Sequence, residues 1–159
     1  LTVGTDQPVY TASRVAEALS LPMPISVETA LRATNKRAMK TAFERHHIPH
    51  VPYAYLERGQ SADSLRALGT PLVIKPLDSQ GQRGVFKVDT AEETVRRLEE
   101  TLQFSRENVA LVETFYPSDE VTFSGYLREG RLYPLLLTDR QHMRVGFRLR
   151  RFLQSCLPG

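Results

Sequence analysis

The chain has 159 residues, 41% of them hydrophobic, and a formal net charge of +3. This length suits one domain with an ordinary hydrophobic core, which can contain two subdomains. Neither an apolar run long enough to span a membrane nor a signal-peptide pattern occurs, so we expect a cytoplasmic protein with no membrane partner. The single cysteine, Cys156, excludes an internal disulfide, and no Cys/His spacing matches structural zinc, so we predict no metal site in this chain.

The positive charge is concentrated at the C-terminal end. Five arginines and no acidic residue follow Asp139, which leaves a net charge of −2 on residues 1–139. A basic tail can bind phosphates without regard to sequence. The rest of the chain lacks the basic stripe with interleaved aromatic side chains that a nucleic-acid-binding domain displays, so we predict no nucleic-acid partner.

The N-terminal part of the chain has helical periodicity. The chain begins at Leu1 without an initiator methionine and inside a short β-like run, so we expect it to be part of a longer protein. Apolar residues at helical spacing over 9–19 predict one helix, and Ser26 can cap a second helix that runs to about residue 32.

A third helix is predicted to follow Thr34 or Asn35, either of which can cap it, and to end near His47 before a proline. Lys36 lies in the first turn of this helix, where a cation opposes the helix dipole. Lys36 is therefore either an ordinary solvated side chain or a residue that meets an anion. His46 and His47 lie at the end of the helix that favours positive charge, which explains them better than a metal site does.

The most informative pattern is a strand, a loop and a strand over residues 71–88. The first apolar run ends at Lys75, and the loop that follows contains Gly81 and Gly84. A mobile glycine loop can close its backbone N–H groups over phosphate oxygens while Lys75 adds a fixed positive charge. The same pattern fits a β-hairpin with a glycine-containing turn, and this segment alone does not decide between the two.

The other predicted elements surround this segment. We expect strands at 51–56 and 109–112, helices at 61–68 and from the capping box 90–93 to residue 102, and a hairpin at 120–127 and 131–138 that turns at Glu129–Gly130. The strand at 109–112 ends on Glu113, and an aromatic pair and a proline follow. A stiff exit of this kind can present backbone groups to an adenine edge, although an ordinary strand exit with solvated acids has the same sequence.

The order of these elements resembles that of the ATP-grasp family over about residues 1–140. The features that carry the resemblance are the helix with Lys36, the break at Ile48–Pro52, the run Pro71–Pro76, the loop with Gly81 and Gly84, Val112–Glu113, and Glu120. The opening, residues 4–22, looks like the end of the α/β domain that precedes the nucleotide-binding region in carbamoyl-phosphate-synthetase-like and amino-acid-ligase members.

The resemblance implies an α+β fold, with a small α/β subdomain that contains the mobile strand–loop–strand, followed by the start of an antiparallel sheet subdomain. Residues 1–30 would end the preceding domain, residues 31–140 would form a truncated nucleotide-binding region, and residues 141–159 would be an atypical arginine-rich tail. Two departures stand out: Asn35 occupies a position where Asp is frequent, and the loop has fewer glycines than in many members.

The resemblance also implies a set of ATP-binding residues. Lys36 and Lys75 would contact the phosphates, with Lys75 also beside the adenine. The segment from Gln80 to Gly84 would cover the phosphates, and Glu120 would hold the ribose hydroxyls. Glu113 would meet the adenine amino group, and the backbone of the next three residues would take the rest of its edge. The implied set is Lys36, Lys75, Gln80, Gly81, Gly84, Glu113, Thr114, Phe115, Tyr116 and Glu120.

The chemistry implied is that of an ATP-dependent carboxylate–amine or carboxylate–thiol ligase acting through an acyl phosphate, with ATP and a small carboxylate as partners. No catalytic residue is assigned. Family members hold Mg²⁺ with a Glu and a Glu-x-Asn pair after the hairpin, and the acids of this chain stop at Asp139, so we expect Mg²⁺ only in the full-length parent.

The alternative is a nucleotide-binding or regulatory module without turnover, which the absence of these acids favours. Residues 144–159 do not continue the family pattern, and we expect them to be a non-native tail or an amphipathic helix that docks on a partner. Apolar surface left uncovered in a truncated chain can also drive homo-oligomerisation.

Overall fold

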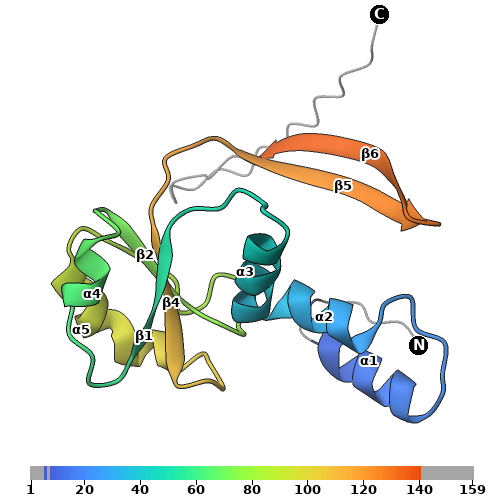
Figure 1. Ribbon diagram of the computed structural model, residues 1–159, viewed down its shortest axis with the longest axis horizontal. Coiled ribbons are helices and arrows are strands. Elements are labelled where there is room, and N and C mark those ends of the chain that lie inside the picture. The colour runs from blue at the N-terminus through green and yellow to red at the C-terminus, as the bar shows by residue number, and fades with distance from the viewer. Residues whose placement is uncertain (1–5, 7, 141–159) are drawn as a thin grey trace, which may run out of the picture. The chain divides into compact units, whose positions relative to one another are not determined.

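The computed structural model describes residue 6 and residues 8–140, and the chain divides into two compact units between Tyr116 and Pro117 (Figure 1). The first unit contains α1 (Val9–Ala18), α2 (Val27–Thr34), α3 (Lys36–Arg45), β1 (Tyr53–Glu57), α4 (Asp63–Arg66), β2 (Leu72–Pro76), β3 (Phe86–Val88), α5 (Ala91–Leu102) and β4 (Val109–Thr114). The second contains β5 (Glu120–Arg128) and β6 (Arg131–Arg140). The predicted tail and the β-like run at the N-terminus lie outside the described residues.

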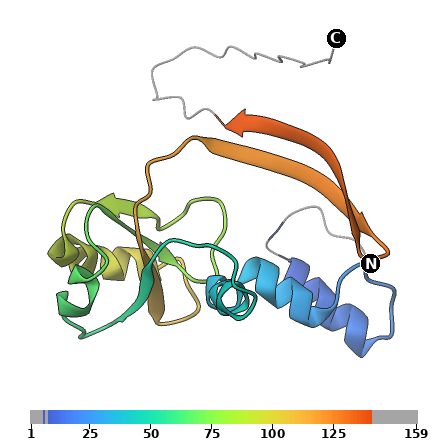
Figure 2. The same cartoon turned by 45° about the horizontal axis from the view of Figure 1, so that its top comes forward.

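The first three helices follow one another with local caps. Helices α1 and α2 pack side by side (Figure 2), and Ser26 caps α2 by accepting a hydrogen bond from the Thr29 N–H (3.1 Å). Helix α2 ends at Thr34 and α3 begins at Lys36, with Asn35 extended between them. The Asn35 side chain accepts from the Ala38 N–H (3.1 Å), so Asn35 rather than Thr34 caps α3.

The centre of the first unit is an antiparallel sheet with strand order β1-β4-β2-β3. Strands β2 and β3 and the glycine loop between them confirm the predicted strand, loop and strand. The two strands pair as antiparallel neighbours, as in the hairpin alternative. Along β2 the residues alternate: Leu72, Ile74 and Pro76 are buried, while Val73 and Lys75 are partly exposed on the other face. Thr90 caps α5 through the Glu93 N–H, which confirms the start of the predicted helix.

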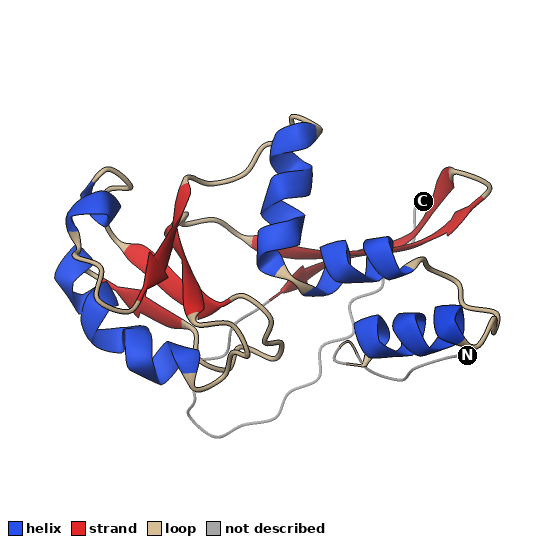
Figure 3. Cartoon of the chain, turned by 60° about the horizontal axis from the view of Figure 1, so that its bottom comes forward, coloured by secondary structure: helices blue, strands red, loops and turns tan. Residues whose placement is uncertain are grey.

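The two faces of this sheet have different roles. The hydrophobic core lies between the sheet and the helices α4 and α5, and its buried members are Leu56, Leu65, Leu72, Ile74, Val88, Ala91, Leu98, Leu102, Ala110 and Val112. Figure 3 shows α4 and α5 on one side of the sheet and α3 on the other. Lys75 therefore points away from the core and toward the side on which α3 lies.

The second unit is a two-stranded hairpin over its described residues. The turn falls at Glu129 and Gly130, as predicted, and both residues have positive φ (51° and 74°). The register shifts between Ser124 and Gly125. No helix in the described residues is long and apolar enough to cross a membrane.

Candidate functional site

Helix α3 carries two lysines one turn apart, so Lys36 and Lys40 lie on the same face of the helix. The N-terminus of α3 is fixed to the segment after β2 by two contacts. The Lys36 backbone N–H donates to the Leu77 carbonyl (2.8 Å), and the Lys36 ammonium donates to the Ser79 carbonyl (2.8 Å). Lys36 is thus held at the base of the glycine loop rather than free in solvent, and its contact with an anion stays a prediction.

Glu113 joins this helix to the sheet. The Lys40 ammonium lies 2.6 Å from Glu113 Oε1, and the Lys75 ammonium contacts Oε2 of the same carboxylate. Lys75 and Glu113 come from neighbouring strands in which Val73 is directly opposite Glu113, so they are diagonal neighbours on one face of the sheet. We call Lys36, Lys40, Lys75 and Glu113 the lysine cluster.

Burial and charge together set the protonation of the lysine cluster. Burial alone raises the pKa of Glu113, but hydrogen bonds from Lys40 and Lys75 outweigh it, so the net pKa is lowered and the carboxylate is ionised at neutral pH. Burial lowers the pKa of Lys36, as does the positive charge of Lys75, while Asp78 and Glu113 act in the opposite direction. Two ammonium groups contact the Glu113 carboxylate, and the charge of Lys36 also interacts with it. Three positive charges therefore stand against the two negative charges of Glu113 and Asp78.

The glycine loop is anchored at both ends. The Gln80 side-chain amide donates to the Thr34 carbonyl (3.1 Å). Gly84 has φ +69°, and a Cβ there would lie 2.8 Å from Phe104 Cδ2 and 3.1 Å from the Thr101 carbonyl oxygen. Gly81 has φ +73° and open space around it. Gly84 therefore serves close packing against the end of α5, and the exposed part of the loop lies around Gly81.

The segment after Glu113 already uses two of its backbone N–H groups within the protein. The Thr114 N–H donates to the Pro52 carbonyl (3.1 Å), and the Phe115 N–H donates to the Pro71 carbonyl (2.9 Å). Contacts of Thr114 and Phe115 with an adenine edge would then use their carbonyl oxygens. Tyr116 is exposed. Glu120 begins β5 in the second unit, so its place beside the lysine cluster stays a prediction.

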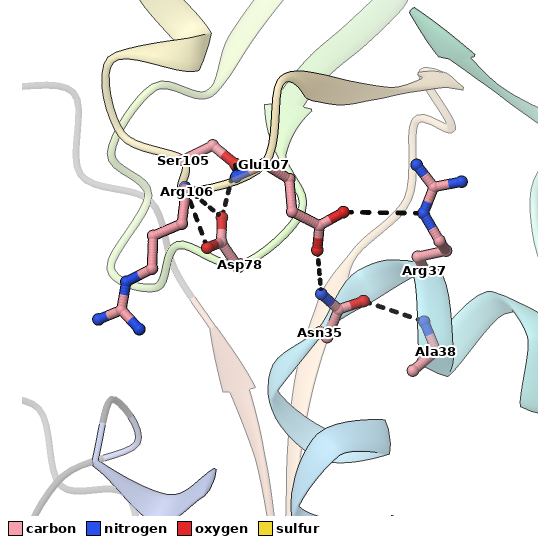
Figure 4. Close-up of polar contacts among 7 residues, drawn as sticks. All are labelled: Asn35, Arg37, Ala38, Asp78, Ser105, Arg106 and Glu107. Carbon is pink, nitrogen blue, oxygen red and sulfur yellow. Dashed lines mark hydrogen bonds and ion pairs between the residues drawn. The ribbon is translucent and has the colours of Figure 1, made fainter. Parts of the chain in front are cut away.

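Two acidic residues link α3 and the glycine loop to the segment between α5 and β4 (Figure 4). Asp78 accepts hydrogen bonds from the Ser105 hydroxyl (2.6 Å) and the Arg106 N–H (3.1 Å). Glu107 accepts from the Asn35 side-chain amide (2.6 Å) and lies 3.8 Å from Arg37 Nε. The segment thus braces both the helix that carries Lys36 and the loop that follows Lys75.

Sequence reasoning missed Lys40, Asp78 and Glu107. Lys40 had a signal, because it follows Lys36 by one helical turn. Asp78 and Glu107 had no such signal, because their partners lie 27 to 72 residues away in the chain.

A cavity of about 560 Å³ adjoins the segment that contains Glu107. Residues of α1, α2 and the loops at 78–83 and 103–107 line it, and the residues of the lysine cluster do not. Among the described residues, no group of three or more His, Cys, Asp or Glu could hold a metal.

Comparisons with known proteins relate the sequence and the fold of the chain to a class of proteins. No family model matches the chain. It is 30% identical over 108 residues to a D-alanine–D-alanine ligase of Flavobacterium psychrophilum. This match covers 66% of this chain and 32% of that protein. It is 32% identical over 112 residues to the D-alanine–D-alanine ligase of Maridesulfovibrio salexigens. This match covers 70% of this chain and 36% of that protein.

Solved structures agree with these relatives. D-alanyl-alanine synthetase A of Vibrio cholerae aligns with a TM-score of 0.70 at 21% identity, covering 82% of this chain and 41% of that one. The Bacillus anthracis D-alanine–D-alanine ligase complexed with ATP aligns with a TM-score of 0.69 at 20% identity, covering 84% of this chain and 43% of that one.

The fold is therefore that of part of an ATP-grasp ligase, which confirms the predicted α+β fold. The curated relatives support the family resemblance predicted from sequence. Within that class, the chain is related to the amino-acid ligases, and the relatives named above are D-alanine–D-alanine ligases. The chain spans about a third of the length of the curated relatives it matches.

Proposed function

We propose that this chain is the ATP-binding part of a ligase that joins a small carboxylate to an amine or a thiol. The observation that carries the proposal is the lysine cluster. Lys36 and Lys75 are partly exposed, and positive charge around them exceeds negative charge. Polyphosphate is the ligand whose charge suits such a site, because ammonium groups form strong charge-assisted hydrogen bonds with phosphate oxygens.

In the proposed reaction, a carboxylate oxygen of the substrate attacks the γ-phosphorus of ATP, and ADP leaves. The amine or thiol then attacks the acyl carbon, and inorganic phosphate leaves. Lys36 and Lys75 would orient the phosphates and offset their charge, and no protein nucleophile is needed. D-alanine, which appears in the names of the relatives, is the first carboxylate to test.

Mg²⁺ is implied by the resemblance, but the residues described here do not fit it. No group of three or more acidic, His or Cys side chains in the described residues could hold a metal. We therefore derive no step through Mg²⁺ and assign it to the longer protein. The second candidate is a nucleotide-binding module without turnover, and the feature that favours it is the absence of acidic residues after Asp139. We further propose that the protein acts in the cytoplasm, where ATP is available.

Calorimetric titration with ATP tests the proposed function. Wild-type protein should bind ATP more tightly than adenosine, and Lys75→Ala should weaken ATP binding by about 1 to 3 kcal/mol because a charge-assisted contact is lost. Arg96→Ala, which removes an exposed charge on α5, is the control and should bind like wild type. Equal affinity of wild type and Lys75→Ala for ATP would count against the assigned site.

Hydroxylamine trapping separates the two candidate functions. A ligase that contains this chain should form a hydroxamate when it is incubated with ATP, Mg²⁺, D-alanine and hydroxylamine, because hydroxylamine captures an acyl phosphate. A module without turnover should bind ATP and form none.

A further inference from the structure

Lys40 is the buried residue of α3, with 6% of its surface exposed. A lysine this buried destabilises the folded protein unless its charge is paired. Its partner is Glu113, which is 8% exposed. Lys40 therefore lies too deep to contact a ligand directly, and its role has to be sought in what it does to Glu113.

Two contacts fix the position of the Lys40 ammonium. On one side it lies 2.6 Å from Glu113 Oε1. On another it lies 4.9 Å from the centre of the Tyr53 ring, a cation–π distance. Tyr53 is itself held because its hydroxyl donates to Glu44 (2.6 Å). Lys40 is thus a fixed charge that occupies one oxygen of Glu113.

The other oxygen of Glu113 contacts Lys75, whose side chain is 24% exposed. If Glu113 had Lys75 as its one cationic partner, the pair would be neutral, and the carboxylate would repel an incoming phosphate. With Lys40 also bound, two positive charges face the single negative charge of Glu113. The group of three then carries a net positive charge, and Lys75 can attract an anion. Lys36 adds a third positive charge to the lysine cluster, and the negative charge of Asp78 acts on Lys36.

We propose that Lys40 is a positioning residue for polyphosphate binding: it holds and neutralises Glu113 so that Lys75 remains available to the phosphates. This inference rests on the proposed function, because it deepens the role of the same site. It explains why a buried lysine accompanies two partly exposed ones, and why one carboxylate contacts cations from two different elements.

The test compares ATP with adenosine, because adenosine lacks phosphates. In Lys40→Met the ratio of ATP affinity to adenosine affinity should fall about tenfold or more, the effect of about one charge-assisted hydrogen bond. Lys40→Arg keeps the charge and should keep most of the ratio. Arg45→Met removes an exposed charge from the same helix and should leave the ratio within about threefold of wild type.

A second substitution distinguishes positioning from a merely structural role. Adding Glu113→Gln to Lys40→Met removes the carboxylate that would otherwise neutralise Lys75, so the double variant should recover most of the lost ratio. A residue that only supports the fold would not be rescued in this way. An unchanged ratio in folded Lys40→Met, or no recovery in the double variant, would overturn the proposal.

A measurement without nucleotide separates this inference from the proposed function. NMR titration of the Glu113 carboxyl should give a higher pKa in Lys40→Met than in wild type, because one of the two stabilising ammonium groups is gone. An equal pKa in the two proteins overturns the positioning role whether or not ATP binds. A raised pKa in Lys40→Met with no ATP binding to wild type would support the electrostatic role and contradict the proposed function alone.

Discussion

Glu113 links the charge of the site to the stability of the fold. Its pKa in the folded protein lies below the ordinary value of 4.5. Ionised Glu113 therefore stabilises the protein above that pH, and the contribution is lost as the pH falls through the folded-state pKa. At neutral pH, Glu113 is the ionic partner of both Lys40 and Lys75, because each ammonium group contacts one of its oxygens.

We predict that Glu113→Gln lowers the free energy of unfolding at pH 7 by about 3 kcal/mol, because it leaves Lys40 buried without an ionic partner. The difference from wild type should narrow as the pH falls from 4.5 through the lowered folded-state pKa of Glu113, below which the wild-type side chain is also neutral. Urea unfolding across this pH range measures both effects. Glu99→Gln, which disrupts the exposed pair with Arg58, is the control and should change stability much less. A pH-independent difference between Glu113→Gln and wild type would contradict the prediction.

Single residues of the site were predictable from sequence where local pattern marks them. Local pattern marked Lys36 as a candidate because a lysine in the first turn of a helix is unfavourable, and Lys75 because it ends a buried strand before a glycine loop. Their roles as phosphate contacts come from the family resemblance and stay predictions. The burial of Lys40 was not predictable, because helical periodicity shows that it shares a face with Lys36 but not that this face packs on Glu113. That information comes from the packing of α3 on the sheet, which the contact between Lys40 and Glu113 shows.

At the scale of elements, the link between Asn35 and Glu107 ties α3 to the segment before β4. The Asn35 side chain does two things: its oxygen caps α3, and its amide donates to Glu107. An aspartate could cap equally well but could not donate, and its carboxylate would repel Glu107. Asparagine at this position therefore suits a chain that has a glutamate across from it.

We predict that Asn35→Asp destabilises the protein by about 1 kcal/mol, because both side chains are partly exposed and solvent screens their repulsion. Glu107→Gln in the same chain should restore most of that loss, since a glutamine can donate to the new aspartate. Urea denaturation of both single variants and the double variant gives the coupling energy. Glu107→Gln alone is the control, and strictly additive effects would show that the two residues do not interact.

The two glycines of the loop give a matched pair of substitutions. Gly84→Ala should destabilise the protein by about 2 to 3 kcal/mol, because a Cβ would clash with Phe104 and the backbone of Thr101 at a positive φ. Gly81→Ala has the same kind of φ but open space, so it should cost only about 1 kcal/mol. Thermal unfolding compares them, and equal losses would contradict the packing role of Gly84.

At the scale of the whole molecule, strand and helix order could be predicted because each element has its own cap, turn or periodicity. The sheet order β1-β4-β2-β3 could not, since strand neighbours are set by contacts distant in the chain. The division after Tyr116 also has no clear signal in the sequence. The predicted boundaries at residues 30 and 140 remain predictions.

The second unit differs from the first in what it buries. Every member of the buried core cluster belongs to the first unit. The hairpin β5–β6 instead exposes large apolar side chains, among them Phe123 (50% exposed), Leu127 (74%), Leu135 (67%) and Leu137 (64%). An isolated two-stranded hairpin is at best marginally stable in water, and exposed apolar surface of this kind promotes association.

We therefore predict that a chain ending at Tyr116 still unfolds cooperatively, with a free energy of unfolding within about 1 kcal/mol of the full chain, because the core is intact. It should also self-associate less. Circular dichroism melts and sedimentation velocity measure the two properties. Leu127→Lys with Leu135→Lys in the full chain is the matched variant, and it should reduce association without truncation. Loss of the cooperative transition in the shortened chain would show instead that the first unit depends on residues 117–159 for its stability.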